Sequence, residues 1–185
     1  MLKKLYEEAE EKMAKSVEAT KNEFATIRTG RASPALVEHI RVNYYGSQLP
    51  VNQLATISIP EPRMILISPW DKGANEAICK AISKSNLGLM PNTDGNVIRI
   101  SIPSLTQERR KELDRVIKKQ AEEGRVGIRN IRHKINSIIK EKEKDKEISE
   151  DESRHAHDEI QKITDKFIDK IDQLLANKEK EILEG

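Results

Sequence analysis

The side chains with the clearest chemical potential in this 185-residue sequence are arginines at helical spacing. On a helix that turns about 100° per residue, Arg125, Arg129, Arg132 and Asn136 fall in one narrow stripe, named here the arginine stripe. A guanidinium group presents a planar fork of donors that matches phosphate, and it also stacks on nucleobases. We therefore expect the arginine stripe to face a polyanion; the alternative is an ordinary solvated helix face.

The helix that carries this stripe also has an apolar side about 110° away, which would bury it in a bundle. That side comprises Ile128, Ile131, Ile135 and Ile138. Gly124 and Gly127 flank the arginines, and each costs about 1 kcal/mol in a helix relative to alanine. Their missing side chains permit close approach either of a ligand or of a neighbouring helix, and the sequence leaves both roles open.

Charge is distributed unevenly along the chain. With 35% charged and 3% aromatic residues, slender helices that bury one seam are favoured over a large globular core. The formal net charge is only +2, so attraction to a polyanion must be local. Residues 109–134 hold ten Lys/Arg against four Asp/Glu, whereas residues 141–185 hold nine against fifteen. The basic face therefore belongs to the helix that bears the arginine stripe.

Other reactive residue types do not assemble into a recognisable site. Cys79, the single cysteine, fits a reducing compartment and lies among apolar residues at helical spacing, so we expect a buried core thiol. His155 and His157 are two residues apart and diverge on a helix, which disfavours metal binding. Nucleophile elbows, Walker loops and dinucleotide fingerprints are missing from the sequence. We expect a non-enzyme without cofactor or metal and, lacking an apolar span, a cytoplasmic protein away from membranes.

Three long helices are predicted to hold the arginine stripe in place. The first covers about residues 2–29 and ends at Gly30, and the second begins after Thr106 and runs for roughly 35 residues, or about 50 Å. Ser149 and Glu152 form a capping box that starts the third. Each helix has one apolar seam, so the three should bury one another in a bundle.

Between the first two helices the apolar period changes from about 3.6 to two. Alternating residues predict strands near 40–44, 55–59, 64–68 and 98–102, with a turn at 45–47. A helix is predicted at about 73–85, stopped by Asn86, Leu87 and Gly88. We therefore expect an α+β protein in which residues 1–30 and 105–185 form a three-helix bundle domain. Residues 31–104 form an inserted small β/α/β domain.

The chain crosses between the two predicted domains twice. Two short crossings make a hinge the default expectation, and the residues assigned to it are Gly30, Arg31, Ser101, Ile102, Pro103 and Ser104. At the first crossing, Ser33 and Pro34 are typical of a helix N-cap and first turn. Arg28 and Arg31 add two cations there, which makes them further candidates for contact with the same polyanion.

Seven segments in fixed order, taken together, resemble the bacterial ribosome recycling factor family from end to end. They are 27–34 (IRTGRASP), 44–46 (YYG), 52–55 (NQLA), 94–99 (DGNVIR), 106–110 (TQERR), 129–132 (RNIR) and 145–151 (DKEISED). The resemblance implies an L-shaped two-domain molecule, similar in outline to a tRNA. It also implies binding of the large ribosomal subunit across the A and P sites, and splitting of the post-termination complex with elongation factor G and GTP to release mRNA and tRNA.

The resemblance also assigns the arginine stripe its anion. Arginines of the middle bundle helix contact ribosomal RNA in this family, which carries over to Arg129 and Arg132, with Arg125 beside them. His133 stands where many members have arginine, which lowers the local charge here. The partners implied are the large ribosomal subunit and elongation factor G, acting with a monomer. The competing hypothesis is a helical scaffold or chaperone-like protein-binding module with a broad exposed apolar patch.

Overall fold

The computed structural model describes residues 1–85 and 87–184, so Asn86 of the predicted helix stop lies outside the described residues. The chain divides into two compact units. One is a helical unit made of Met1–Arg28 and Gln107–Glu184, and the other is an inserted unit made of Thr29–Thr106. The expected α+β class, a three-helix bundle with a small inserted sheet domain, is confirmed.

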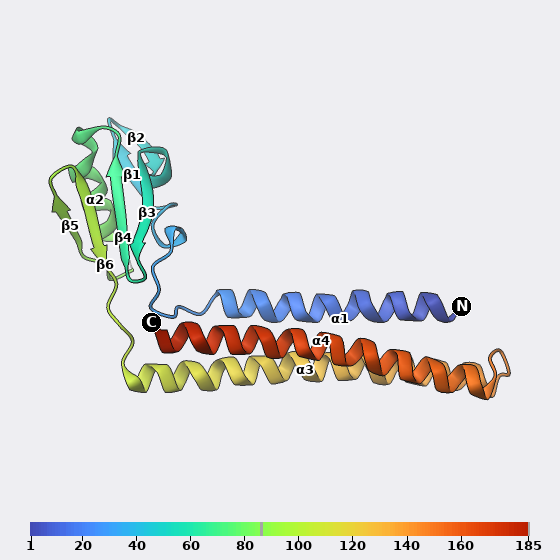
Figure 1. Ribbon diagram of the computed structural model, residues 1–185. Coiled ribbons are helices and arrows are strands. Elements are labelled where there is room, and N and C mark those ends of the chain that lie inside the picture. Colours follow the sequence, from blue (N-terminus) through green and yellow to red (C-terminus); the bar gives the residue numbers. More distant parts are fainter. Residues whose placement is uncertain (86, 185) are drawn as a thin grey trace. The chain divides into compact units, whose positions relative to one another are not determined.

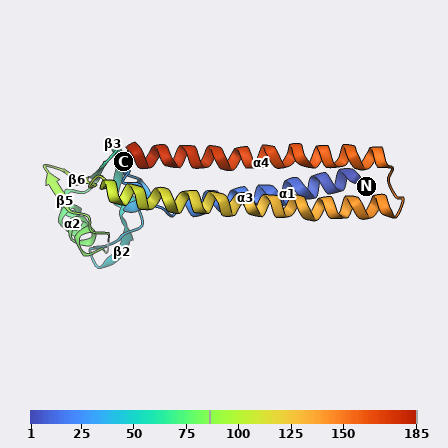
Figure 2. The ribbon, with the colours of Figure 1, turned by 90° about the horizontal axis from the view of Figure 1, so that it is seen from below.

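The helical unit consists of α1 (Leu2–Ala25), α3 (Gln107–Lys144) and α4 (Glu150–Glu184). In both views, α3 runs antiparallel to α1 and α4, so each helix packs on the other two (Figures 1 and 2). α3 has 38 residues, slightly more than predicted. One continuous helix therefore carries the whole arginine stripe.

The core of the helical unit is built from residues three or four positions apart on each helix. On α3 the buried residues are Leu113, Ile117, Ala121, Gly124, Ile128, Ile135 and Ile139. The predicted seam is wrong in detail: Ile131 and Ile138 are only half-buried, whereas Ile139, which was not part of it, is fully buried. Two helices pack on α3, so its most buried line lies between them rather than at the centre of the isoleucine stripe.

The first helix ends earlier than predicted, at Ala25 instead of residue 29. The Thr26 N–H donates to Glu23 O (3.2 Å) and the Ile27 N–H to Phe24 O (3.1 Å), a three-residue step that tightens and closes the last turn. The Thr26 hydroxyl adds a bond to the Glu23 carbonyl (2.7 Å). The threonine therefore ends the helix before Gly30 is reached.

The start of α4 follows the predicted capping box. The Ser149 N–H donates to Glu152 Oε2 (2.7 Å), and the Glu152 N–H donates to Ser149 Oγ (3.1 Å). Both partners lie within one turn, which is why the local sequence was sufficient to predict them. This prediction is confirmed.

The inserted unit packs one helix against antiparallel strands. A four-stranded sheet has the order β3-β4-β6-β5, and β1 and β2 form a separate hairpin. The elements are β1 (Arg41–Tyr44), β2 (Ser47–Pro50), β3 (Ala55–Glu61), β4 (Met64–Pro69), α2 (Asn75–Lys84), β5 (Pro91–Asp94) and β6 (Val97–Ser101), with short 3₁₀ turns at Pro34–Leu36, Val51–Gln53 and Lys72–Ala74. Neither β2 nor β5 was predicted, because neither carries an alternating apolar pattern.

The core of the inserted unit lies between α2 and the sheet. Its fully buried isoleucines are Ile65, Ile67, Ile78, Ile82, Ile98 and Ile100. Cys79, expected in the core, is only half-buried, and its Sγ lies 3.5 Å from Thr93 Oγ1 of β5. Only one side of α2 faces the sheet interior, and Cys79 is at the edge of that side.

Candidate nucleic-acid interface

The arginine stripe lies along the side of α3 that borders α4. Arg125 reaches across to Asp172, with Nη2 2.6 Å and Nε 2.8 Å from Oδ1. Two turns further along α3, Arg132 Nη1 donates to Gln161 Oε1 of α4 (3.1 Å). The stripe is thus fixed in position by polar side chains of the neighbouring helix, and its members do not all have the same charge environment.

A carboxylate of α3 itself bridges the first two arginines. Glu122 Oε2 is 3.0 Å from Arg125 Nη1, and Glu122 Oε1 is 3.0 Å from Arg129 Nη1. Hydrogen bonds from Arg125 and then Arg129 lower the pKa of Glu122. The arginine stripe therefore has an acidic neighbour of its own, because Glu122 lies one turn before Arg125 and on the same side of the helix.

Arg125 is more enclosed than Arg129. Its side chain is 19% exposed, against 42% for Arg129. Partial burial disfavours the charged form, but hydrogen bonds to Asp172 and Glu122 outweigh it and raise the pKa of Arg125. With two carboxylates already bound, this guanidinium joins α3 to α4 and has little capacity left for an external anion.

Arg132 is held differently. Its partner, Gln161, is a neutral amide whose nitrogen in turn donates to Asp165 Oδ1 (2.8 Å). Among the described residues, no carboxylate lies within ion-pair distance of Arg132, so its positive charge is oriented without being neutralised. This is the arrangement expected of a preorganised anion contact.

The stripe ends in an amide that pairs with a histidine of α4. Asn136 Oδ1 is 2.9 Å from His157 Nδ1 of α4, which occupies the histidine as a helix-to-helix partner. His133 is exposed on the same helix. In the described part of the chain, no cluster of three or more metal-ligating side chains is present. Also within the described residues, no helix combines the length and apolar character needed to cross a bilayer.

Comparison with known proteins decides the family. The model of a family described as Ribosome recycling factor matches residues 20–183. A curated ribosome-recycling factor from Carboxydothermus hydrogenoformans is 60% identical over 183 residues, which cover 99% of each chain. This chain belongs to the ribosome recycling factor family.

Solved structures agree with this assignment. A solution structure of the ribosome recycling factor superposes with a TM-score of 0.69 at 50% identity, covering 100% of this chain and 98% of the other. A second chain comes from models of the T. thermophilus ribosome recycling factor and the E. coli elongation factor G bound to the E. coli post-termination complex. It superposes with a TM-score of 0.63 at 50% identity, covering 99% of both chains.

Two other segments that resemble the ribosome recycling factor family, 145–151 and 27–34, form turns with a residue at positive φ. Segment 145–151 forms the turn between α3 and α4, where Lys146 has a positive φ of 60° and Lys142 pairs with Glu147 at 3.0 Å. In segment 27–34, Arg28 and Arg31 are exposed, Gly30 has a φ of +78°, and Ser33 Oγ caps the next turn by accepting from Ala35 N.

The predicted hinge residues differ in how firmly they are held. Ser101 belongs to β6 and pairs with Met64, and the Ile102 N–H donates to Arg63 O at 2.8 Å. Both residues are thus tied to the β3–β4 hairpin of the inserted unit. Pro103 and Ser104 follow the end of that ladder and are exposed.

The two glycines of α3 lie where α1 packs against it. A Cβ on Gly124 would be 2.4 Å from Thr20 Oγ1 and 2.9 Å from Ile171 Cδ1, whereas one on Gly127 would be 3.1 Å from Ser16 Oγ. Ser16 Oγ also donates to the Gly124 carbonyl (3.3 Å). Of the two roles left open by the sequence, close helix packing is the one that the geometry supports.

Proposed function

We propose that this protein is a translation factor that recycles ribosomes after termination. It binds the large subunit across the A and P sites and, with elongation factor G and GTP, splits the post-termination complex so that mRNA and tRNA leave. The observation that carries the proposal is the end-to-end match to ribosome-recycling factors, at 60% identity over 99% of each chain. The factor works as a cytoplasmic monomer and is not itself an enzyme.

The RNA contact that we propose centres on Arg132, with Arg129 next to it. Arg132 is oriented by a neutral amide and keeps its net charge, while Arg129 is 42% exposed and shares one carboxylate. Contacts of this kind recognise phosphates and the shape of folded RNA without reading bases. Arg125 has a supporting role, because its guanidinium is already paired twice. Arg28 and Arg31 are additional contacts near the domain crossing.

Transmission of force from elongation factor G requires freedom between the two domains. We place that freedom at Gly30 and Arg31 on one crossing and at Pro103 and Ser104 on the other. Ser101 and Ile102 move with the inserted unit, since the ladder and the bond to Arg63 hold them. Gly30 suits a hinge because it has a positive φ and no side chain, so its backbone can change conformation with little steric hindrance.

Polysome breakdown tests the proposal directly. Purified protein, elongation factor G and GTP are mixed with polysomes that have been stalled after termination, and each component is omitted in turn. We expect conversion to free subunits only when all three are present. Breakdown that proceeds equally well without this protein would reject the assignment.

A further inference from the structure

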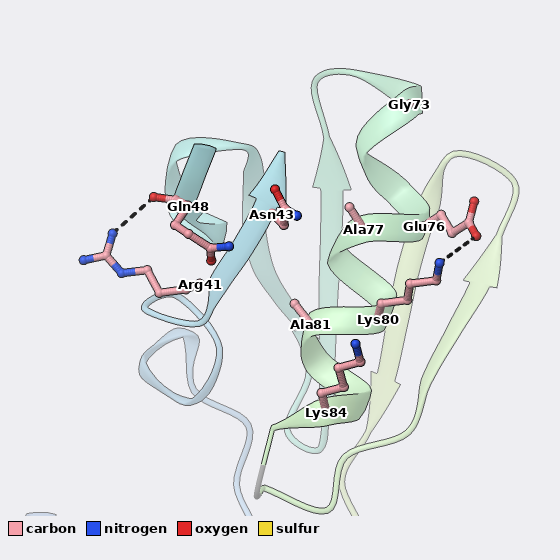
Figure 3. A pocket seen from close by; sticks show the side chains of 9 residues that line it. All are labelled: Arg41, Asn43, Gln48, Gly73, Glu76, Ala77, Lys80, Ala81 and Lys84. Atoms are coloured by element: carbon pink, nitrogen blue, oxygen red, sulfur yellow. Dashed lines mark hydrogen bonds and ion pairs between the residues drawn. The ribbon is translucent and has the colours of Figure 1, made fainter. Parts of the chain in front are cut away.

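A hollow of 470 Å³ lies on the inserted unit, between the β1–β2 hairpin and α2 (Figure 3). On the hairpin side, Asn43 and Gln48 stand opposite each other in the β1–β2 register. On the helix side, Ala77 and Ala81 point toward the hairpin. The hollow is open, polar and confined to one unit.

Small residues keep the hollow open. Gly73, Ala77 and Ala81 recur every four residues along the 3₁₀ turn and α2, so they line one side of this helix. A longer side chain at any of these positions would extend into the space between helix and hairpin. An occupant can therefore approach the helix backbone closely, but it finds no deep apolar pocket.

The charge of the inserted unit is concentrated at this hollow. Residues 29–106 carry seven Lys/Arg and five Asp/Glu, a net charge of +2. Three of those cations, Arg41, Lys80 and Lys84, line the hollow together with one acid, Glu76, which lies 3.3 Å from Lys80. Lys84 Nζ makes no ion pair or hydrogen bond within the described residues. The residues that line the hollow therefore carry as much net charge as the whole unit, with the Arg41 guanidinium turned away from α2 toward the Gln48 carbonyl oxygen (3.5 Å; Figure 3).

An exposed aromatic ring stands at the end of the hollow. Tyr45 is 82% exposed, and its hydroxyl would lie 3.4 Å from a Cβ on Gly73. The ring packs edge-on against Tyr44, whose hydroxyl donates to Asp71 Oδ2 at 2.5 Å. This bond raises the pKa of Tyr44 to about 12 and ties the hairpin turn to the segment before α2. Tyr45 is therefore positioned by its neighbours although its face is open to solvent.

We propose that this hollow binds the ribose-phosphate backbone of a single-stranded RNA segment, with a base stacked on Tyr45. Cations beside an exposed aromatic ring are the combination by which proteins hold single strands. The side-chain amides of Asn43 and Gln48 can both donate and accept, which suits phosphate and ribose hydroxyl together. An acidic peptide is disfavoured because peptide interfaces are usually anchored by apolar side chains in pockets. The inference rests on the proposed function, since it adds a second RNA contact to the ribosome-bound factor.

The test uses the full chain and a fluorescent octauridylate as the probe, with affinity measured as a function of salt. The double variant Arg41→Gln/Lys84→Gln removes two cations that line the hollow. Its matched control, Arg63→Gln/Lys72→Gln, removes one arginine and one lysine of the same unit that do not line it. We expect the hollow variant to reduce the salt slope by about 1.4, at about 0.7 per phosphate contact, and the control to leave it nearly unchanged.

Tyr45→Asn tests the stacking contact separately. Asparagine tolerates the positive φ of 48° at this turn, so the ring is lost without added backbone strain. We expect octauridylate binding to weaken about fivefold.

Equal effects of the hollow and control variants, or no effect of either, would overturn the proposal. A polyglutamate peptide whose binding depends on Arg41 and Lys84 while octauridylate binding does not would also overturn it, in favour of a protein partner. Polysome breakdown by the same variants distinguishes this failure from that of the proposed function. If polysome breakdown requires this protein but octauridylate affinity does not depend on Arg41 and Lys84, the hollow does not bind RNA and the proposed function still stands.

Discussion

The two sides of α3 have different roles and different residue types. One side packs closely against a neighbouring helix, and the other carries long polar side chains. On the side facing α1, Gly124 and Gly127 remove side chains so that the helices approach closely and Ser16 reaches a backbone carbonyl. On the side bordering α4, long arginines reach across to polar partners such as Asp172 and Gln161. The first side is closed by packing. The second stays accessible to a ligand, because its side chains are polar and partly exposed.

A second difference lies within the arginine stripe itself. Arg125 and Arg129 share Glu122, and Arg125 also binds Asp172, whereas Arg132 meets a neutral amide. Equal spacing in sequence therefore does not mean equal availability. The stripe has a part that stabilises the bundle and a part that is free to bind phosphate.

The largest expected effect concerns the closed side. Gly124→Ala places a methyl group 2.4 Å from Thr20 Oγ1 and 2.9 Å from Ile171 Cδ1, so these side chains or their helices must move. We expect the free energy of unfolding to fall by about 2 kcal/mol, because overpacking outweighs the gain in helix propensity. Urea unfolding followed by circular dichroism measures it.

Gly127→Ala is the matched control for that change, since its new methyl group meets only a flexible serine hydroxyl at 3.1 Å. Its unfolding free energy should stay within about 0.5 kcal/mol of the parent. Equal destabilisation by the two variants would remove the distinction between the glycines.

The next effect tests the supporting role of Arg125. Arg125→Ala removes two ion pairs and a partly buried side-chain stem, and we expect it to lower the free energy of unfolding by about 1 kcal/mol. Arg129→Ala, which breaks one more exposed pair, should cost less than about 0.5 kcal/mol. The same urea experiment compares them. A larger loss for Arg129→Ala would show that the enclosed arginine is not the structural one.

The smallest expected effect concerns the carboxylate that bridges the first two arginines. Glu122→Gln keeps the side-chain shape but removes the negative charge between the two guanidinium groups, so affinity for large ribosomal subunits should rise about threefold. Glu123→Gln changes the net charge equally at an exposed neighbour for which the described residues offer no ion pair. Filter binding at fixed salt should show the rise for Glu122→Gln only. An identical rise for both variants would reduce the effect to net charge.

The pH dependence of Glu122 follows from its lowered pKa. Its stabilising contribution is fully present above the pKa of the unfolded chain, about 4.3, and is lost as pH falls through the lower folded value. The difference in unfolding free energy between the parent and Glu122→Gln should therefore begin to shrink as the pH falls below about 4.3 and vanish below the lowered folded pKa. A difference that persists at low pH would contradict the assigned bridge.

Local features of this fold could be predicted from the sequence, whereas cross-helix pairings could not. The capping box at Ser149 and Glu152 lies within a single turn, and the long helices follow from their apolar period. Glu122 was also within reach, because its spacing from Arg125 is visible in the sequence. Asp172 and Gln161 are 47 and 29 positions from their arginines, and only the rotation of α4 brings them together.

The strands show the same distinction between features that the local sequence predicts and features that depend on pairing with another segment. β4 and β6 carry alternating isoleucines and were predicted, but β5 (Pro91–Asp94) has no apolar alternation and exists because a tight turn returns it to β6. In contrast to β5, the early end of α1 depends on a contact within one turn, the hydrogen bond from the Thr26 hydroxyl to the Glu23 carbonyl oxygen. That signal is local, although weaker than the glycine that follows.

We propose that Arg132 binds ribosomal RNA while Arg125 holds the bundle together. The most direct measurement is the salt dependence of binding to purified large subunits for the parent, Arg132→Ala and Arg125→Ala. We predict that Arg132→Ala lowers the slope of log affinity against log salt by about 0.7–0.9, one phosphate contact, and that Arg125→Ala leaves it unchanged. An unchanged slope for Arg132→Ala, or an equal loss for Arg125→Ala, would contradict the account.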